Sequence, residues 1–223
     1  MATYWADSGF MAAGPSGPMR EDPLSWYVWH FTHKRNLDRI AAAGGLVPDS
    51  TAQPAAAVTD QSIKGRRALT LVVPTDAPTY PRNVTVADHV PWYFAPRSPT
   101  LFRVVTGYNL PYKEGHAPLV LLGLKLGDLA ASGSTWCYSD RNAAANIVRF
   151  GTSVAALPRF IDFDLMSEKM WAYTRDDPDR PARRAAEVLV HGHTPIGLVS
   201  AVVTSNHDTL SVARGMLGSS PRQ

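Results

Sequence analysis

The sequence has little cysteine, no long apolar run and no recognisable leader. Its 223 residues include one cysteine, Cys137, so an internal disulfide and a cysteine-rich zinc site are both excluded. No apolar stretch approaches the ~18 residues that a membrane-spanning helix needs. Residues 1–25 lack a basic region followed by an apolar one, so they do not resemble a signal peptide. We therefore expect a cytoplasmic protein without a membrane segment.

Several familiar motifs are also absent. The sequence contains no P-loop and no G-x-G-x-x-G after a predicted strand, so neither usual nucleotide fingerprint is present. The seven histidines show no H-E-x-x-H or comparable ligand spacing, and there is no G-x-S-x-G for acyl chemistry. The sequence therefore predicts no metal site and no serine-hydrolase mechanism.

The charge is mildly basic and unevenly distributed. A net charge of +3 and a pI of about 9.1 only weakly favour an anionic partner. Lys64, Arg66 and Arg67 form one cluster inside a proline-rich stretch from residue 47 to 88. A second cluster comprises Arg175, Arg180, Arg183 and Arg184. Taken alone, either cluster is equally consistent with a solvated surface and with a binding site.

Hydrophobic patterning predicts one α+β domain over residues 25–218, with a flexible arm over residues 1–24. The predicted strands cover 26–31, 92–95, 117–126, 136–138, 188–190 and 196–205. The first predicted helix has Thr32 as its N-cap and ends at Gly44-Gly45. The other predicted helices cover 62–69, start near Ser98-Pro99, follow Ser139 or Asp140, and cover 207–217.

Two residues at the end of the first predicted strand share one face. His30 and Thr32 are two positions apart, so their side chains point the same way from a strand. One interpretation is a packed histidine followed by a helix cap. The other is a polar grip on a sugar or amide ligand, to which the helix N-terminus adds donors for an anionic group.

Glu187 stands where an arginine-rich segment meets the apolar run Val188–Val190. One interpretation is a surface carboxylate that pairs with Arg183 or Arg184, a common and weak interaction. The alternative is a carboxylate at the start of a core strand that faces a cleft and contacts a cationic transition state. Position alone leaves both open.

Four segments, in this order, resemble the DarT family of DNA ADP-ribosyltransferase toxins. They are "WHFTHKRNLDRIAAAGGL", "HVPWYFAPRSPTLF", "YSDRNAAA" and "RRAAEVLVHG", and the resemblance spans roughly residues 26 to 205. The second segment is close to the family pattern V-P-F-Y-F-A-P-R-S-P. Trp29, Phe31 and Trp92 replace the usual Tyr, Ile and Phe, which are conservative changes.

The resemblance implies an ADP-ribosyltransferase-like fold, with split mixed β-sheets, flanking helices and an NAD cleft between the sheets. NAD is then the co-substrate, and no metal takes part. Glu187 matches the catalytic glutamate, which would stabilise the oxocarbenium-like centre formed when nicotinamide leaves. Arg66 is the best match for the catalytic and NAD-contacting arginine, and Arg67 is the alternative. The other residues implied to bind NAD are His30, Thr32, Asn36, Leu37 and Tyr93.

The resemblance also implies single-stranded DNA as the acceptor, with thymine favoured, and a role as the toxin of a toxin–antitoxin system. Phosphate contacts and base stacking are the usual means of binding such a strand. The residues expected to bind nucleic acid are Arg97, Asn142, Arg175, Arg180, Arg183 and Arg184. Tyr93, Trp136, Trp171 and Tyr173 are candidates for stacking.

The expected partners beyond DNA are few. The resemblance implies a macrodomain antitoxin, and we expect the enzyme to be a monomer. Two alternatives stay open: the same NAD chemistry on RNA, a nucleoside or a protein, and a nucleic-acid-binding module without catalysis.

Overall fold

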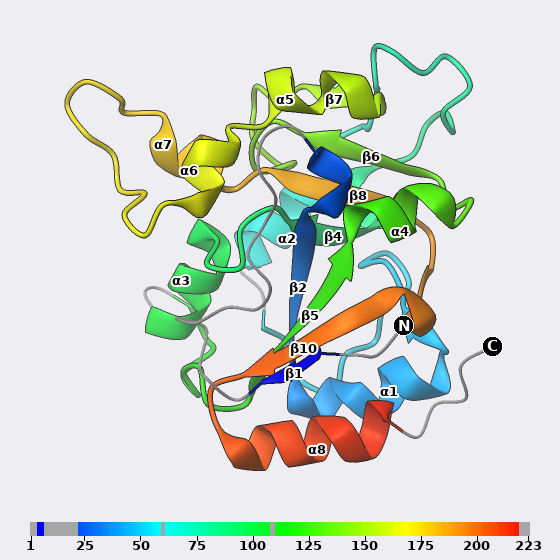
Figure 1. Cartoon of the computed structure of the whole chain (residues 1–223), viewed down its shortest axis with the longest axis vertical. Helices are drawn as coiled ribbons and strands as arrows, with labels where there is room; N and C mark the ends of the chain where they lie inside the picture. The colour runs from blue at the N-terminus through cyan, green and yellow to red at the C-terminus, as the bar shows by residue number, and fades with distance from the viewer. Residues whose placement is uncertain (1–3, 7–21, 59–60, 108–109, 219–223) are drawn as a thin grey trace.

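The computed structural model describes residues 4–6, 22–58, 61–107 and 110–218, and its centre is an eight-stranded sheet (Figure 1). The strand order is β1-β10-β5-β2-β4-β8-β6-β7; β1 and β10 are parallel and the other pairs antiparallel. Its strands are β1 (Tyr4–Ala6), β2 (Tyr27–His33), β4 (His89–Tyr93), β5 (Leu119–Lys125), β6 (Trp136–Ser139), β7 (Phe150–Gly151), β8 (Glu187–His191) and β10 (Val199–Thr204). A separate pair joins β3 (Gly45–Leu46) to β9 (Thr194–Pro195).

The eight-stranded sheet is nearly divided in two between β2 and β4. These strands share one register pair, Trp29 with Tyr93, whereas β2 pairs with β5 over seven residues. Pro91 contributes to this opening because it has no N–H with which to extend a ladder. The prediction of split mixed sheets therefore corresponds to two half-sheets that meet at a single residue pair.

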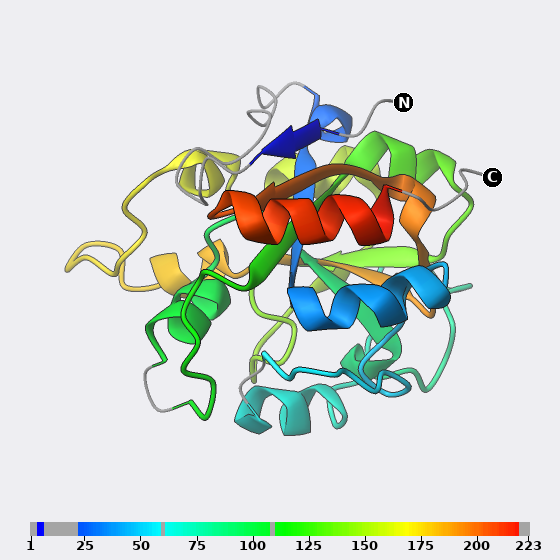
Figure 2. The same ribbon diagram turned by 90° about the horizontal axis from the view of Figure 1, so that it is seen from below.

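Helices cover both faces of the sheet. They are α1 (Leu37–Ala42), α2 (Gln61–Arg67), α3 (Pro99–Thr106), α4 (Leu126–Ala131), α5 (Leu157–Phe160), α6 (Phe163–Ser167), α7 (Arg180–Arg184) and α8 (His207–Leu217). Viewed from below, α1 and α8 lie side by side, and α2 lies at the opposite side of the molecule from β1 (Figure 2). Within the described ranges, no helix is long and apolar enough to cross a membrane.

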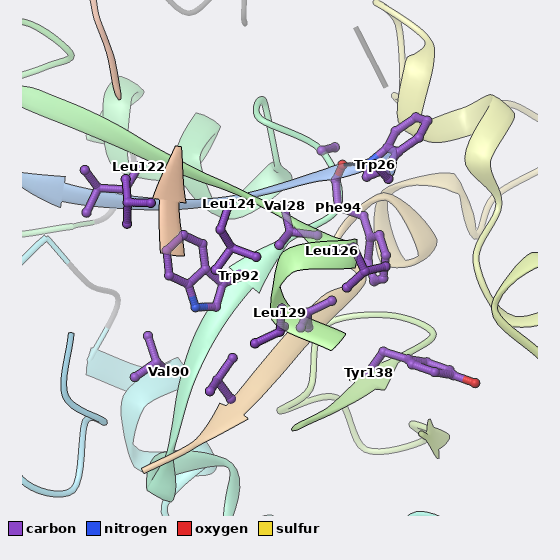
Figure 3. Close-up of a cluster of buried hydrophobic side chains, with 14 of the residues drawn as sticks. Trp26, Val28, Val90, Trp92, Phe94, Leu122, Leu124, Leu126, Leu129 and Tyr138 are labelled. Carbon is purple, nitrogen blue, oxygen red and sulfur yellow. Dashed lines mark hydrogen bonds between the residues drawn. The ribbon is translucent and has the colours of Figure 1, made fainter. Parts of the chain in front are cut away.

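The largest core lies on one face of the sheet. Val28, Val90, Trp92, Leu122 and Leu124 extend from the strands toward α4 and are all fully buried (Figure 3). Burial of such side chains stabilises the fold by about 1.5–3 kcal/mol each. A second cluster, on the other face, joins Trp29 and Leu121 to α3. Strand residues therefore alternate between two apolar environments, which explains the nearly continuous apolar runs in the sequence.

Gly123 is required where β5 runs beside β2, opposite Trp29. A Cβ atom at this position would lie 2.8 Å from the ring of Trp29, which is its register partner. The small residue therefore lets the indole lie flat across the neighbouring strand. This contact fixes Trp29 at the one position where β2 and β4 are joined.

Several sequence-based boundaries need correction. The strand β2 continues through Thr32 to His33, so Thr32 is not a helix N-cap; the His33 ring instead accepts from Arg35 N at the start of a 3-10 turn. No helix follows Ser139 or Asp140, because residues 140–149 form turns. The predicted arm contains the short strand β1, and the rest of it, apart from residues 22–24, lies outside the described residues. Ser98 caps α3 and Gly44 has a φ of 68°, as the sequence indicated.

Candidate active site

Glu187 is the centre of the candidate site. It begins β8, opposite Tyr93 of β4 and Ser139 of β6, and its side chain is 0% exposed. One carboxylate oxygen accepts from Arg67 Nη1 at 2.9 Å, and the other accepts from Ala143 N at 3.0 Å. The carboxylate is therefore held by one guanidinium and one backbone amide, and the interpretation of Glu187 as a surface residue paired with Arg183 or Arg184 is wrong.

The amide that binds Glu187 is oriented by a local turn. The Asn142 side chain accepts from Ala144 N at 2.9 Å, and the carbonyl of Asn142 accepts from Ala145 N at 2.9 Å. Asn side chains commonly close such turns by bonding the backbone two residues ahead. The turn leaves Ala143 N–H pointing at Glu187, so Asn142 shapes the surroundings of the Glu187 carboxylate.

Arg67, rather than Arg66, faces Glu187. Both belong to α2, but Arg67 is buried, whereas Arg66 is exposed and lines a shallow hollow on the other side. Burial acts to lower the pKa of Arg67, but the nearby charge of Glu187, with lesser contributions from Tyr93 and Asp49, raises it above the ordinary value. The placement of Arg66 in the site is thus wrong: adjacent helix positions point about 100° apart, so only one of the two can face Glu187.

The guanidinium of Arg67 keeps donors for a ligand. Its Nε and Nη2 are buried and make no hydrogen bond to any described residue. Buried polar groups are almost always hydrogen-bonded, and an unsatisfied one costs about 1–3 kcal/mol. The unsatisfied Nη2 therefore marks a position where a bound molecule would place an acceptor.

His30 is held as a neutral ring with one nitrogen available. Its Nδ1 lies 2.9 Å from the carbonyl oxygen of Pro91, which can only accept, so Nδ1 carries the proton. Burial lowers the pKa of His30 below its ordinary value, and the bond to Pro91 only partly opposes this. Among the described residues nothing bonds Nε2, which is therefore an acceptor at the cavity wall.

Thr32 and Asn36 organise the loop that closes the cavity. Asn36 Nδ2 donates to Thr32 Oγ1 at 3.1 Å and to the carbonyl of Ala56 at 2.9 Å, while its Oδ1 accepts from Ala56 N at 2.9 Å. The side-chain amide of Asn36 therefore serves both the N–H and the carbonyl of Ala56, as a neighbouring strand would. Both predicted residues line the cavity, but the side chain of Asn36 is engaged in fixing the 53–57 loop.

A cavity of about 190 Å³ joins these groups. Its wall includes His30, Phe31, Thr32, Arg67 and Tyr93. Phe31 and Tyr93 stack with ring centroids 5.9 Å apart, and burial raises the pKa of Tyr93. The cavity therefore lies where β2 and β4 diverge. Arg67 forms part of its wall, and Glu187 contacts Arg67 without lining the cavity.

Leu37 does not line this cavity. It is 0% exposed and packs in the main core, because it is the first residue of α1 and faces the sheet. The prediction that Leu37 forms a cofactor wall is wrong. The residues of the same helix that do line the cavity are Arg39 and Ile40.

Three predicted DNA-binding arginines are engaged within the loop before β8. Arg183 forms a bidentate ion pair with Asp177, in which Nη1 lies 3.0 Å from Oδ1 and Nη2 lies 2.7 Å from Oδ2. Arg180 pairs with Glu168. Arg184 is 2% exposed and donates to the carbonyl of Leu165; burial lowers its pKa to about 10. These side chains brace the loop, because each has its partner inside the same segment.

The other predicted nucleic-acid contacts lie differently. Arg175 is exposed near the tip of the loop between α6 and α7, which projects from the molecule (Figure 1). Arg97 is half-buried, and its charge acts to lower the pKa of Arg184. Of the stacking candidates, Tyr173 is 75% exposed, whereas Trp171 packs edge-on against Phe102. Trp136 packs against Tyr138.

Two site features have no signal in the sequence. Asp49 lies beside Arg67 and lines the cavity, yet it stands in a stretch of Pro, Ser, Thr and Ala with no recognisable pattern. The amide of Ala143 is equally invisible, because any residue supplies an N–H. The Asn142 turn chemistry was the only available hint.

Comparison with known proteins matches this arrangement to one family. The model of the family described as "ssDNA thymidine ADP-ribosyltransferase, DarT" matches residues 29–222. A "DNA ADP-ribosyl transferase" of Mycobacterium tuberculosis is 44% identical over 214 residues, which is 96% of this chain and 91% of that protein. A "DNA ADP-ribosyl transferase" of Thermus aquaticus is 30% identical over 81% of this chain and 75% of its own length.

Solved structures show the same fold. Thermus sp. 2.9 DarT in complex with ADP-ribosylated ssDNA superimposes with a TM-score of 0.76 at 22% identity, covering 86% of this chain and 89% of that chain. The complex of the same protein with NAD+ gives 0.74 over 93% of this chain and 94% of that one.

The chain belongs to the DarT family of ADP-ribosyltransferases. The predictions of the family, of its α+β ADP-ribosyltransferase fold and of an enzyme that acts on NAD are confirmed.

Proposed function

We propose that this enzyme transfers ADP-ribose from NAD to a thymine base in single-stranded DNA and releases nicotinamide. The observation that carries the proposal is the buried Arg67–Glu187 pair, whose Arg67 lines a cavity together with His30 and Thr32. The family match supports the acceptor, since its description names thymidine in single-stranded DNA. The complexes of the Thermus protein with NAD+ and with ADP-ribosylated ssDNA support both substrates.

The cavity suits the reacting half of NAD. Its volume of about 190 Å³ is below the ~300–1,000 Å³ of sites that enclose a whole drug-sized ligand, so the rest of the dinucleotide lies along its open rim. His30 Nε2 accepts from a ribose hydroxyl, and Thr32 contacts the same region. Tyr93 and Phe31 pack against the nicotinamide ring.

Glu187 stabilises the reacting carbon. When the bond between nicotinamide and C1′ breaks, the electron pair leaves with the pyridine nitrogen and C1′ becomes oxocarbenium-like. The fixed carboxylate places negative charge near C1′ through its electrostatic field, since Glu187 is fully buried and does not line the cavity wall. Preorganised groups of this kind contribute about 3 kcal/mol to the transition state.

Arg67 takes the role that the sequence analysis assigned to Arg66. Its unsatisfied Nη2 donates to a carbonyl oxygen of thymine and stabilises the base as N3 loses its proton. N3 then bonds to C1′, and the products are ADP-ribosylated DNA, nicotinamide and one proton. A guanidinium is always charged and is a poor base, so Glu187 accepts this proton in transit.

Arg175 and Tyr173 make the outer contacts with DNA. Both are exposed on the projecting loop, whereas the charges of Arg180 and Arg183 are already paired inside it. A charged side chain and a ring are what a flexible strand needs for phosphate contact and stacking.

The biological role proposed is that of a toxin with a cognate partner. We also propose that the enzyme acts as a toxin whose modification a macrodomain antitoxin removes; similarity to Thermosipho africanus DarTG, of which this chain covers 47%, supports such a pairing.

The test is transfer in vitro. The purified protein is incubated with NAD and mixed-sequence single-stranded DNA oligonucleotides, with matched RNA and an unrelated protein as competing acceptors. Mass spectrometry then measures the masses of the products. The proposal expects one added ADP-ribose on thymine-containing DNA and none with Glu187→Gln. NAD binding without modification of any DNA would refute it, and modification of RNA or protein alone would change the acceptor.

A further inference from the structure

A second carboxylate lies on the side of Arg67 away from Glu187. Asp49 Oδ2 is 3.5 Å from Arg67 Nε, while Arg67 Nη1 is 2.9 Å from Glu187 Oε2. Lys64 Nζ lies 3.8 Å from the other oxygen of Asp49. Lys64, Asp49 and Arg67 line the cavity, and together with the buried Glu187 they form a row of alternating charges in that order.

The backbone around Asp49 is fixed by local and distant bonds. Ala52 N donates to the carbonyl of Pro48 at 2.8 Å, which closes a turn around Asp49. Ser50 N donates to the carbonyl of Ala87 at 2.9 Å, which ties the turn to the segment leading into β4. Asp49 is thus anchored to the strand that carries Tyr93, and it is not on a free loop.

This placement has a geometric consequence. A guanidinium presents its donors as a rigid planar fork, so restraints on two of its edges fix the direction of the third group. Glu187 holds Nη1 and Asp49 attracts the Nε edge. Nη2, which has no hydrogen bond to a described residue, is then directed by the other two.

The charge balance is the second consequence. Arg67 and Glu187 alone would be neutral, and a neutral pair stabilises a cationic C1′ poorly. Asp49, which is only 24% exposed, adds a second carboxylate to the single guanidinium, so Glu187 shares the charge of Arg67 instead of being fully offset by it. Lys64, the outer partner of Asp49, makes the row of four neutral as a whole. Charges in such surroundings interact several times more strongly than in water.

We propose that Asp49 is a positioning residue for the transfer reaction: it orients the Arg67 guanidinium and balances its charge, so that Glu187 keeps its negative potential for C1′. This inference rests on the proposed function. Asp49 acts through Arg67 and takes no part in bond making.

The experiment compares Asp49→Asn with Asp208→Asn. Asn has the shape of Asp without the charge, and Asp208 is the matched control because it is an exposed carboxylate on α8 that does not line the cavity. For each variant we would measure kcat and KM of ADP-ribose transfer to a thymine-containing oligonucleotide, the Kd of NAD by calorimetry, and the Tm.

The expected result for Asp49→Asn is a fall in kcat of about 10- to 100-fold, the loss that misplacing a catalytic group produces. The Kd of NAD is expected to change less than about threefold and the Tm by less than about 3 °C, because the substrate does not need this charge to bind. Asp208→Asn should retain at least about half of the wild-type kcat.

Two outcomes would overturn the inference while leaving the proposed function intact. One is an active wild type with an unchanged kcat in Asp49→Asn. The other is a parallel loss of kcat, NAD affinity and Tm, which would make Asp49 a folding residue only. A wild type that binds NAD and modifies no DNA would overturn the proposed function and this inference together.

Discussion

Removing the charge of Arg67 is expected to cost more stability than removing that of Glu187. Arg67→Met leaves the fully buried Glu187 with one amide partner, Ala143 N–H, and leaves Asp49 with Lys64 as its cationic partner. Glu187→Gln instead leaves Arg67 paired with Asp49. The asymmetry follows because the row holds two carboxylates around one guanidinium.

The magnitude follows from the distance. Two unit charges 2.9 Å apart attract by about 6 kcal/mol at an effective dielectric constant of 20. Desolvation offsets part of this, and breaking a buried pair from one side costs about 3–5 kcal/mol. We therefore expect about 3–5 kcal/mol for Arg67→Met and about 1–2 kcal/mol for Glu187→Gln, where a neutral amide keeps some hydrogen bonding.

Urea unfolding followed by fluorescence of the six tryptophans measures both values. With a slope near 2 kcal/mol per molar, Arg67→Met should lower the midpoint by about 1.5–2.5 M. The double variant Arg67→Met with Glu187→Gln should be more stable than Arg67→Met alone, since no buried charge is left unpaired. A midpoint for Arg67→Met near that of the wild type, or below it by less than Glu187→Gln, would refute the reasoning.

Three further predictions concern the cavity and the loop. NAD affinity should stay constant above pH 6.5 and fall only well below it, because the pKa of His30 is lowered and protonation of its Nε2 removes a hydrogen-bond acceptor. Calorimetry at a series of pH values measures the Kd of NAD, and the His30→Asn variant should lose this pH dependence. Asn36→Leu should lose about 2–4 kcal/mol of stability, because the N–H and carbonyl of Ala56 lose their partners, and faster amide exchange at residues 52–58 would localise the loss. Arg175→Gln should reduce the slope of log Kd for DNA against log salt concentration by about one without changing the Tm, because Arg175 is exposed. Arg183→Gln should instead speed proteolysis of the 168–179 loop, because it removes the ion pair with Asp177.

The sequence predicted correctly those features that depend only on residues close together in the chain. The apolar run at 26–31, the cap at Ser98 and the stop at Gly44 depend on neighbouring residues, and the structure contains all three features. Tyr4–Ala6 was missed because three residues carry no periodicity and their partner, β10, lies almost 200 residues away. Thr32 was predicted to be a helix N-cap but lies in β2, because threonine is favoured both in strands and at helix N-caps.

The site shows where local patterns stop being informative. Nothing in the pair Arg66-Arg67 says which residue faces the sheet; a partner 120 positions away decides it. The loop arginines show a related limit: the sequence reveals their positive charge but gives no sign that Arg180 pairs with Glu168 and Arg183 with Asp177. The positive charge of a segment predicts its attraction for DNA only after the arginines that form ion pairs within the segment are subtracted.

The position of the cavity follows from one weak point in the sheet. Pro91 cannot extend a ladder toward β2, so His30 satisfies the Pro91 carbonyl with its ring instead of its backbone. That bond keeps β2 and β4 close while leaving a gap between them, and it fixes the tautomer that presents Nε2 to a ligand. Replacing Pro91 by valine would supply the missing N–H, and a closed ladder would leave less room in the cavity. The same residue that interrupts the sheet therefore both opens the site and sets the protonation of its histidine.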